Sequence, residues 1–223
     1  PENETAIDVL NSAIVKVRAK QMDPIITPPL QSLLECTAAE ESFVKRMVIS
    51  NMWLFKNIVI SNLEKNKQTN AMVHTTIVPT IVKAGIKDNV IPSIANATFN
   101  SRILPGQTSD DVVNFVKNAI NDDRVTVKKQ TISLMEASSS TSSDHPTFKM
   151  LESITKKIVP NVLVSPYLMI GATDSRYYRP FSEAVLNFTP MQNAKGFHGI
   201  DERIGIGDLS RMVNFYKLVL AEK

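Results

Sequence analysis

The sequence has little cysteine and no long apolar run, and it lacks a basic block. Its 223 residues include one cysteine, Cys36, which excludes an intrachain disulfide framework and indicates a buried free thiol. No stretch stays apolar for the roughly 20 residues that a membrane-spanning helix needs. The net charge is only +3, and basic residues are scattered. We therefore expect a globular protein that binds neither membranes nor nucleic acid.

Glycine is absent from the first third of the chain, and this part has a helical pattern. Apolar residues recur at helical spacing, and Thr5 is the expected N-cap of the first helix. The predicted helices cover residues 5–20, 30–35 and 40–63, with a proline-rich loop over 22–29. Because residues 40–63 are apolar on more than one face, we expect this helix to be covered on more than one side.

The hydrophobic period then changes from helical to alternating. Residues 75–86 are rich in Thr, Ile and Val, and residues 94–104 alternate between apolar and polar side chains, so both are predicted strands. Thr108 begins a further helix in capping-box style, and residues 125–130 are predicted to form another strand. This order predicts most of an α+β split-βαβ sandwich, ferredoxin-like, whose first strand would lie upstream of this chain.

A serine-rich loop at residues 137–144 precedes a segment with a different pattern. Asp208 is the expected cap of its last helix. The other predicted elements are a helix over 148–158 and apolar strands over 162–170 and 184–188. Such strands alternating with helices suggest a parallel α/β sheet, but two strands are too few for one to stand alone. We therefore expect this segment to be a fraction of an α/β domain.

Five residues are candidates for binding or chemistry, and their roles remain open on residue type alone. Arg102, at a strand end, is either a solvated arginine or a guanidinium that holds a carboxylate with two parallel hydrogen bonds. Asn89 is either a turn residue or an amide donor. Gly171 and Thr173 follow an apolar strand, where ligands of α/β sheets bind. His198 is a candidate metal ligand with no partner ligand at a recognisable spacing.

The turn at Gly171 also has a plainer interpretation. Asp174 and Arg176 could form a local ion pair that supports the loop, in which case exposed Thr173 and the backbone N–H groups need not hold an anion. The sequence favours neither interpretation over the other.

Four segments, taken in order, carry a resemblance that single residues do not. They are Thr75–Pro92, Phe99–Thr108, Gly171–Arg176 and His198–Ile204. In order and spacing they closely resemble the carboxypeptidase S and N-acyl-amino-acid hydrolase branch of the aminoacylase family of dizinc metallopeptidases. The resemblance extends over almost the whole chain.

This resemblance implies an α/β catalytic domain with two zinc ions and an inserted lid of four strands and two helices, which often makes the dimer. Residues 1–133 would be the lid or dimerisation domain without its first strand, and residues 30–63 its helical enlargement. Residues 134–223 would be the C-terminal segment of the α/β catalytic domain. A homodimer through the lid is the implied assembly.

The resemblance also implies roles for the candidate residues. His198 would be the last zinc ligand, while Asn89 and Arg102 would hold the substrate's free carboxylate or the neighbouring carbonyl. Gly171 and Thr173 would face that carboxylate. In the complete enzyme, two zinc ions lower the pKa of a bridging water, a glutamate takes its proton, and the amide bond of a small peptide or N-acyl amino acid is cleaved.

The family's other zinc ligands and its glutamate base would lie upstream of Pro1, where the sequence starts abruptly. Because zinc needs three or four protein ligands, we expect a fragment with no catalytic residue of its own, which alone neither binds zinc tightly nor hydrolyses substrate. Its partner would be the missing N-terminal catalytic segment. The alternative is a non-enzymatic lid module for dimerisation or regulation. The sequence indicates neither compartment nor preferred acyl group.

Overall fold

The chain forms two compact units in its computed structural model. The described residues are 3–130, 135–169, 171, 173–192, 194–196 and 199–222. The units are Pro1–Pro28 with Met47–Ser139, and Pro29–Arg46 with Ser140–Lys223, and each is treated by itself. Across these described residues, no helix has the length and apolar character to cross a membrane. The predicted domain division between residues 133 and 134 stays a prediction.

Two helices of the first unit begin with the same capping motif. α1 (Ala6–Arg18) begins at Thr5, whose N–H donates to the Asp8 carboxylate at 2.8 Å while the Asp8 N–H donates to the Thr5 hydroxyl. α6 (Ser109–Ile120) begins at Thr108 with the same capping box. Each box satisfies N–H groups that a helix otherwise leaves without partners, and both predicted N-caps are confirmed.

The sheet of the first unit is an antiparallel hairpin. β1 (Thr76–Ala84) pairs with β2 (Ala95–Arg102), and exposure alternates along the whole of β2, as its sequence pattern predicts. Ile77 of β1 and Phe99 of β2 lie on the packed face, against the core. The opposite face of β2 is exposed to solvent and carries Asn96, Thr98, Asn100 and Arg102.

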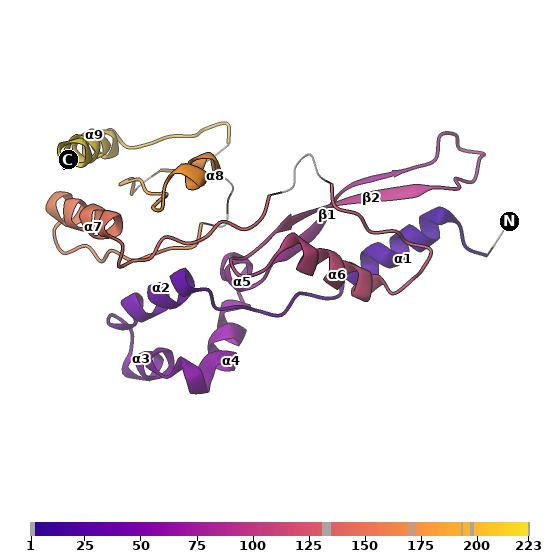
Figure 1. Cartoon of the computed structure of the whole chain (residues 1–223), viewed down its shortest axis with the longest axis horizontal. Coiled ribbons are helices and arrows are strands. Elements are labelled where there is room, and N and C mark those ends of the chain that lie inside the picture. Colours follow the sequence, from indigo (N-terminus) through magenta and orange to yellow (C-terminus); the bar gives the residue numbers. More distant parts are fainter. Residues whose placement is uncertain are drawn as a thin grey trace. The chain divides into compact units, whose positions relative to one another are not determined.

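The core of the first unit lies between α1, α6 and one face of the hairpin (Figure 1). The Lys16 ammonium donates to the Ile120 carbonyl at 2.9 Å, which joins α1 to the last turn of α6. The buried cluster consists of Ala13, Val17, Met22, Val112, Val116, Ala119 and Ile120. Helices on one face of an antiparallel sheet define a small α+β domain, which is the class that the sequence predicts for this part.

The strand predicted over residues 125–130 is wrong. These residues hold no strand, although their exposure still alternates. Val125 and Val127 pack against the buried cluster of the first unit. The alternation therefore reflects packing of an extended segment on the core, without a strand partner for its backbone among the described residues.

The residues predicted to be helical over 30–35 and 40–63 form short helices: α2 (Pro28–Ala38), α3 (Phe43–Ser50) and α4 (Met52–Leu63), and α5 (Lys67–Val73) follows in sequence. The single helix predicted over 40–63 is broken at Asn51, whose backbone leaves the helical region. Its side-chain amide donates to the Met47 carbonyl at 2.8 Å, which competes with a regular helix.

The exposure of apolar side chains on α4 also differs from the prediction. Val59 and Ile60 are buried, but Trp53, Leu54 and Ile58 are exposed, with Trp53 at 83%. Among the described residues, this apolar helix is therefore covered on one side only, where the sequence predicts cover on more than one.

Two long helices of the second unit share a buried contact. α7 (Pro146–Ile158) and α9 (Ile206–Ala221) pack together, and Ile154 and Phe215 are fully buried. Phe215 also contacts Phe188, with ring centroids 5.0 Å apart. Two short turns, α8 (Ser175–Tyr178) and η2 (Arg179–Phe181), lie between the two helices in sequence.

Both strands predicted in the second unit are wrong for the residues that the structure describes. Residues 162–169 and 184–188 are extended and hold no strand, and Ile170 lies outside the described residues. The backbone of Val185 is tied to the side chain of Thr141, at 3.2 Å for both its N–H and its carbonyl. An apolar run becomes a strand only when another strand pairs with it.

The predicted cap of the last helix is also wrong. Gly205 is the N-cap of α9, and Asp208 lies inside the first turn, buried and paired with Arg211. The helix dipole stabilises a carboxylate in the first helical turn even when that carboxylate is not the N-cap. An aspartate at the start of a helix is therefore compatible with either position, and here the two positions differ by three residues.

Candidate functional site

Arg102 lies on the outer face of the hairpin, away from α1 and α6. It pairs across the sheet with Thr76, and it shares its exposed face of β2 with Thr98 and Asn100. Directly opposite and alternate residues of an antiparallel pair share a face. The structure therefore presents one guanidinium, a hydroxyl and an amide along the exposed face of the strand. This arrangement suits the recognition of a carboxylate.

Asn89 lies at the other end of the hairpin. It occupies a turn in the connection 85–94, beyond the last strand pair, Ala84 and Ala95 (Figure 1). The strand from Ala95 to Arg102 alone spans about 23 Å at ~3.3 Å per residue. The structure thus does not bring Asn89 and Arg102 of one chain together.

The turn at Gly171 lies in the second unit. The Thr173 hydroxyl is 2.6 Å from the Ser175 hydroxyl, donates to the Asn187 side-chain oxygen at 3.1 Å and accepts from the Ser175 N–H. Thr173 is half-buried, not exposed as the sequence suggested. These bonds fix the Thr173 side chain, and its hydroxyl has one hydrogen to share between its neighbours and a ligand.

Arg176 follows that turn and contacts an aromatic ring. Its guanidinium carbon lies 4.6 Å from the centroid of the Tyr177 ring, and it donates to the Tyr177 hydroxyl at 2.7 Å. This cation–π geometry holds the arginine against the chain.

His198, the predicted zinc ligand, lies outside the described residues. The described residues around it close a loop, because Lys195 and Arg203 exchange two backbone hydrogen bonds of 3.0 Å. Gly196 has a φ of +74°, and a Cβ there would lie 2.7 Å from the Asp201 carbonyl oxygen. Only glycine fits this position without movement of the loop.

Within the described part of the chain, no three His, Cys, Asp or Glu residues gather in a way that could hold a metal ion. The two described histidines have other contacts: His74 is bound to Met22 and Glu64, and His145 accepts from the Thr147 N–H. The described donors do not fit a dizinc centre, which needs several ligands per ion. No chemical step through zinc is therefore assigned to them.

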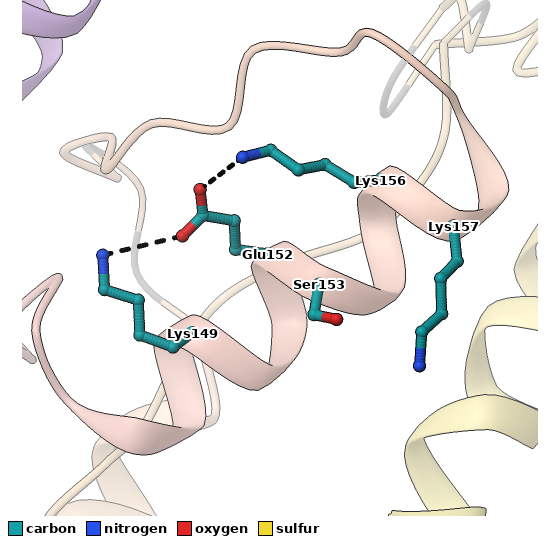
Figure 2. Close-up of a pocket in the computed structure, with 5 residues that line it drawn as sticks. All are labelled: Lys149, Glu152, Ser153, Lys156 and Lys157. Carbon is teal, nitrogen blue, oxygen red and sulfur yellow. Dashed lines mark hydrogen bonds and ion pairs between the residues drawn. The ribbon is translucent and has the colours of Figure 1, made fainter.

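A shallow hollow on α7 is basic but belongs to an ordinary helix surface (Figure 2). Glu152 lies 2.7 Å from Lys156 and 3.6 Å from Lys149, and Lys157 is paired with Glu222. The Lys156 hydrogen bond holds the pKa of Glu152 below its usual value. Each of these lysines already pairs with a carboxylate, and none of the predicted site residues lines the hollow.

His74 is a buried polar residue whose contacts the sequence does not reveal. It is 4% exposed, and both ring nitrogens contact oxygen atoms. Its partners lie 10 and 52 residues away, so no local motif could indicate them.

Comparison with known proteins shows which family this chain is similar to. Residues 3–127 match the family model of the M20 peptidase dimerisation domain. A probable carboxypeptidase S-like protein 2 of Dictyostelium discoideum is 36% identical over 220 residues, which cover 97% of this chain and 42% of that protein. The N-fatty-acyl-amino acid synthase/hydrolase PM20D1 of Mus musculus is 34% identical over 223 residues, covering 96% and 44%. No solved structure matches this chain.

More distant similarity extends to Homo sapiens aminoacylase-1, which is 24% identical over 192 residues, covering 84% of this chain and 45% of that protein. The chain belongs to the M20 family of peptidases and carries the dimerisation domain of that family. It spans less than half the length of the curated relatives it matches.

Proposed function

We propose that this chain supplies the lid and part of the α/β catalytic domain of a hydrolase that cleaves an amide bond next to a free carboxylate. The substrates would be small peptides or N-acyl amino acids. The names of the relatives support this class, because they describe a carboxypeptidase, an N-fatty-acyl-amino acid synthase/hydrolase and an aminoacylase. The structural observation that supports this proposal is the exposed position of Arg102 on the outer face of β2.

Arg102 is proposed to bind the substrate carboxylate. Its backbone is held by pairing with Thr76, and two residues later the Leu104 N–H donates to the Thr75 hydroxyl at 2.9 Å. A planar guanidinium on a fixed strand end can donate two parallel hydrogen bonds to a carboxylate. This binding would select substrates with a free acid beside the scissile amide.

Asn89 is proposed to serve the site of a second copy. An arginine side chain and an asparagine side chain together reach far less than the ~23 Å that separates the two ends of β2. One small substrate therefore cannot touch Asn89 and Arg102 of the same chain. A dimer through the matched dimerisation domain would let Arg102 of one copy and Asn89 of the other meet at one substrate.

The test compares an N-acyl amino acid with its C-terminal amide, using the complete polypeptide that contains these residues. Arg102→Ala should lower kcat/KM for the acid about 100-fold, since hydrogen bonds to charged groups contribute ~1.5–3 kcal/mol each. The amide lacks the carboxylate, so its kcat/KM should not change. Thr98→Ala, on the same face of β2, is the matched control. An equal fall for acid and amide would refute the role of Arg102.

The remaining site residues are assigned by resemblance. In this proposal His198 is one zinc ligand, and Gly171 and Thr173 form the wall that faces the carboxylate. Zinc supplies the activation of water when bound, and it takes three or four protein ligands. These 223 residues alone should therefore hold zinc only weakly. Tight stoichiometric zinc after dialysis of the purified chain, measured by elemental analysis, would contradict this expectation.

A second candidate function is a non-enzymatic module for dimerisation or regulation. The match of residues 3–127 to a dimerisation domain favours it. Hydrolysis assays of the complete polypeptide distinguish the two functions. If the chain is a non-enzymatic module, the complete polypeptide should form a stable dimer and hydrolyse neither the acid nor the amide.

A further inference from the structure

Asn187 extends from a backbone that is held on both sides. The Val185 N–H donates to the Thr141 hydroxyl, and that hydroxyl donates to the Val185 carbonyl, each at 3.2 Å. One residue beyond Asn187, the Phe188 ring packs on the buried ring of Phe215. Successive side chains of an extended segment point to opposite sides, so the Asn187 side chain points away from this aromatic contact, and it is exposed.

The oxygen of the Asn187 side chain is bound by the turn at Thr173. The Thr173 hydroxyl donates to Oδ1 of Asn187 at 3.1 Å. The same hydroxyl accepts from the Ser175 N–H at 3.3 Å and lies 2.6 Å from the Ser175 hydroxyl. Because an amide oxygen can only accept, the one hydrogen of the Thr173 hydroxyl is committed to Asn187. Ser175 is therefore the donor in the contact between the two hydroxyls.

These contacts leave Thr173 without a hydrogen for a ligand. Its oxygen accepts two hydrogen bonds from Ser175, and its hydrogen is used by Asn187. The side-chain nitrogen of Asn187 carries two hydrogens. Within the part of the chain that the structure describes, this nitrogen donates to no protein atom. The donor that the turn offers to a ligand is thus the Asn187 amide and not the Thr173 hydroxyl.

We propose that Asn187 is a further binding residue, whose side-chain nitrogen donates to the substrate carboxylate, and that Thr173 is its positioning residue. The inference rests on the proposed function, in which the turn at Gly171 faces that carboxylate. A carboxylate only accepts hydrogen bonds, so it suits a fixed N–H donor. The amide cannot present its oxygen instead without breaking the bond to Thr173, so the site discriminates against a ligand that carries a donor there.

The orientation of the amide can be tested in the 223-residue chain, by nuclear magnetic resonance with carbon-13 and nitrogen-15 in the asparagine side chains. Thr173→Val removes the hydroxyl, so the side-chain carbonyl carbon of Asn187 loses a hydrogen bond and its signal should move upfield. Thr173→Ser keeps a hydroxyl and should leave the signal close to its wild-type position. If Thr173→Val alters only the nitrogen signal, or neither signal, the amide is not held by its oxygen and the proposal fails.

The binding role is tested with Asn187→Asp in the complete polypeptide. The substitution keeps an oxygen for Thr173 and replaces the donating nitrogen with an oxygen that carries negative charge. For the N-acyl amino acid, kcat/KM should fall about tenfold or more, because a hydrogen bond to a charged group is lost and a repulsion is added. For the C-terminal amide, which has no carboxylate, kcat/KM should not fall.

The matched control is Asn214→Asp, which makes the same change of charge at an exposed position of α9 and should leave both values unchanged. If Asn187 had only a structural role, Asn187→Asp would lower kcat/KM equally for the acid and the amide. That result, or no fall for the acid, would overturn the proposal.

The positioning role of Thr173 gives a further measurement. If Thr173 acts through Asn187, the variant that combines Thr173→Val with Asn187→Ala should hydrolyse the acid no more slowly than Asn187→Ala alone. Additive losses would show that Thr173 itself contacts the carboxylate and would overturn its positioning role.

Failure of the proposed function gives a different result. If the wild-type polypeptide hydrolyses neither the acid nor the amide, the proposed function fails, and equilibrium binding of the acid to the same polypeptide decides the role of Asn187. Weaker binding by Asn187→Asp than by Asn214→Asp would support the binding residue. Equal binding by the two variants, or no binding of the acid by the wild type, would overturn it.

Discussion

The first unit has a sheet and a shared core, whereas the second unit has helices and extended segments without a strand in the described residues. In the first unit, the hairpin pairs segments separated by a short connection, and seven buried residues join α1 to α6. In the second, Phe215 and Ile154 between α7 and α9 carry the core. Antiparallel strands can pair with the next strand in sequence through a short connection. An apolar segment without such a neighbour becomes a strand only if a strand distant in sequence pairs with it.

The largest expected effect is on the core of the first unit. Val17 on α1 is 2% exposed, so Val17→Asp buries an unpaired charge and should cost about 4 kcal/mol or more in the free energy of unfolding. Val15→Asp, on the exposed side of the same helix, should change it by no more than about 0.5 kcal/mol. Urea unfolding followed by circular dichroism measures both; equal losses would contradict the assigned core.

The core of the second unit should be nearly as sensitive. Phe215→Ala removes a fully buried ring that contacts Phe188, and it should cost about 3 kcal/mol. Phe181→Ala, at an exposed position in the same unit, is the matched control. The measurement is amide-exchange protection along α9, and a loss no larger than that of the control would show that α7 and α9 do not form a core.

Helix capping should have a smaller effect. Thr108→Ala removes the N-cap of α6 and should cost about 1 kcal/mol, whereas Thr126→Ala at an exposed site should cost little. Thr108 hydrogen bonds also hold the pKa of Asp111 below its usual value. The stabilisation by Asp111 is therefore present above the ordinary carboxyl pKa and lost as pH falls through the folded value. Unfolding curves at neutral and acidic pH should show the difference between wild type and Thr108→Ala shrinking in acid.

The smallest effect concerns an exposed pair in the first unit. Hydrogen bonds from Arg124 lower the pKa of Asp122 from 3.8 to about 2. Its stabilising contribution is thus present above pH 3.8 and lost as pH falls towards the folded value. Arg124→Ala should return the Asp122 pKa towards 3.8 in a carboxyl titration by nuclear magnetic resonance, with Lys156→Ala in the second unit as control. An unchanged Asp122 pKa would contradict the pairing.

The elements that the sequence predicts correctly are those with local signals. Thr5 and Thr108 precede carboxylates at capping-box spacing, and the alternation of β2 needs no distant information. The wrong predictions depend on partners. Residues 125–130 alternate because they pack on a core, and the break at Asn51 depends on a side chain that bonds to the preceding turn. Neither cause is visible in a hydrophobic pattern.

The candidate site also has parts that the sequence predicts and parts that it does not. Arg102 at a strand end and Asn89 in a turn follow from the predicted hairpin, and so does their separation, because strand length fixes it. The contacts of His74 do not follow, because its partners come from the loop after α1 and the end of α4. Long-range polar contacts of this kind need a structure.

The most direct test of the account is a mixing experiment with two variants of the complete polypeptide, Asn89→Ala and Arg102→Ala. Each alone should lose activity on the carboxylate substrate. If each site takes Arg102 from one copy and Asn89 from the other, an equal mixture with exchanged subunits should recover about a quarter of wild-type activity, since half of the dimers are mixed and each has one intact site. Mixed dimers without any recovered activity would contradict a site shared between two copies.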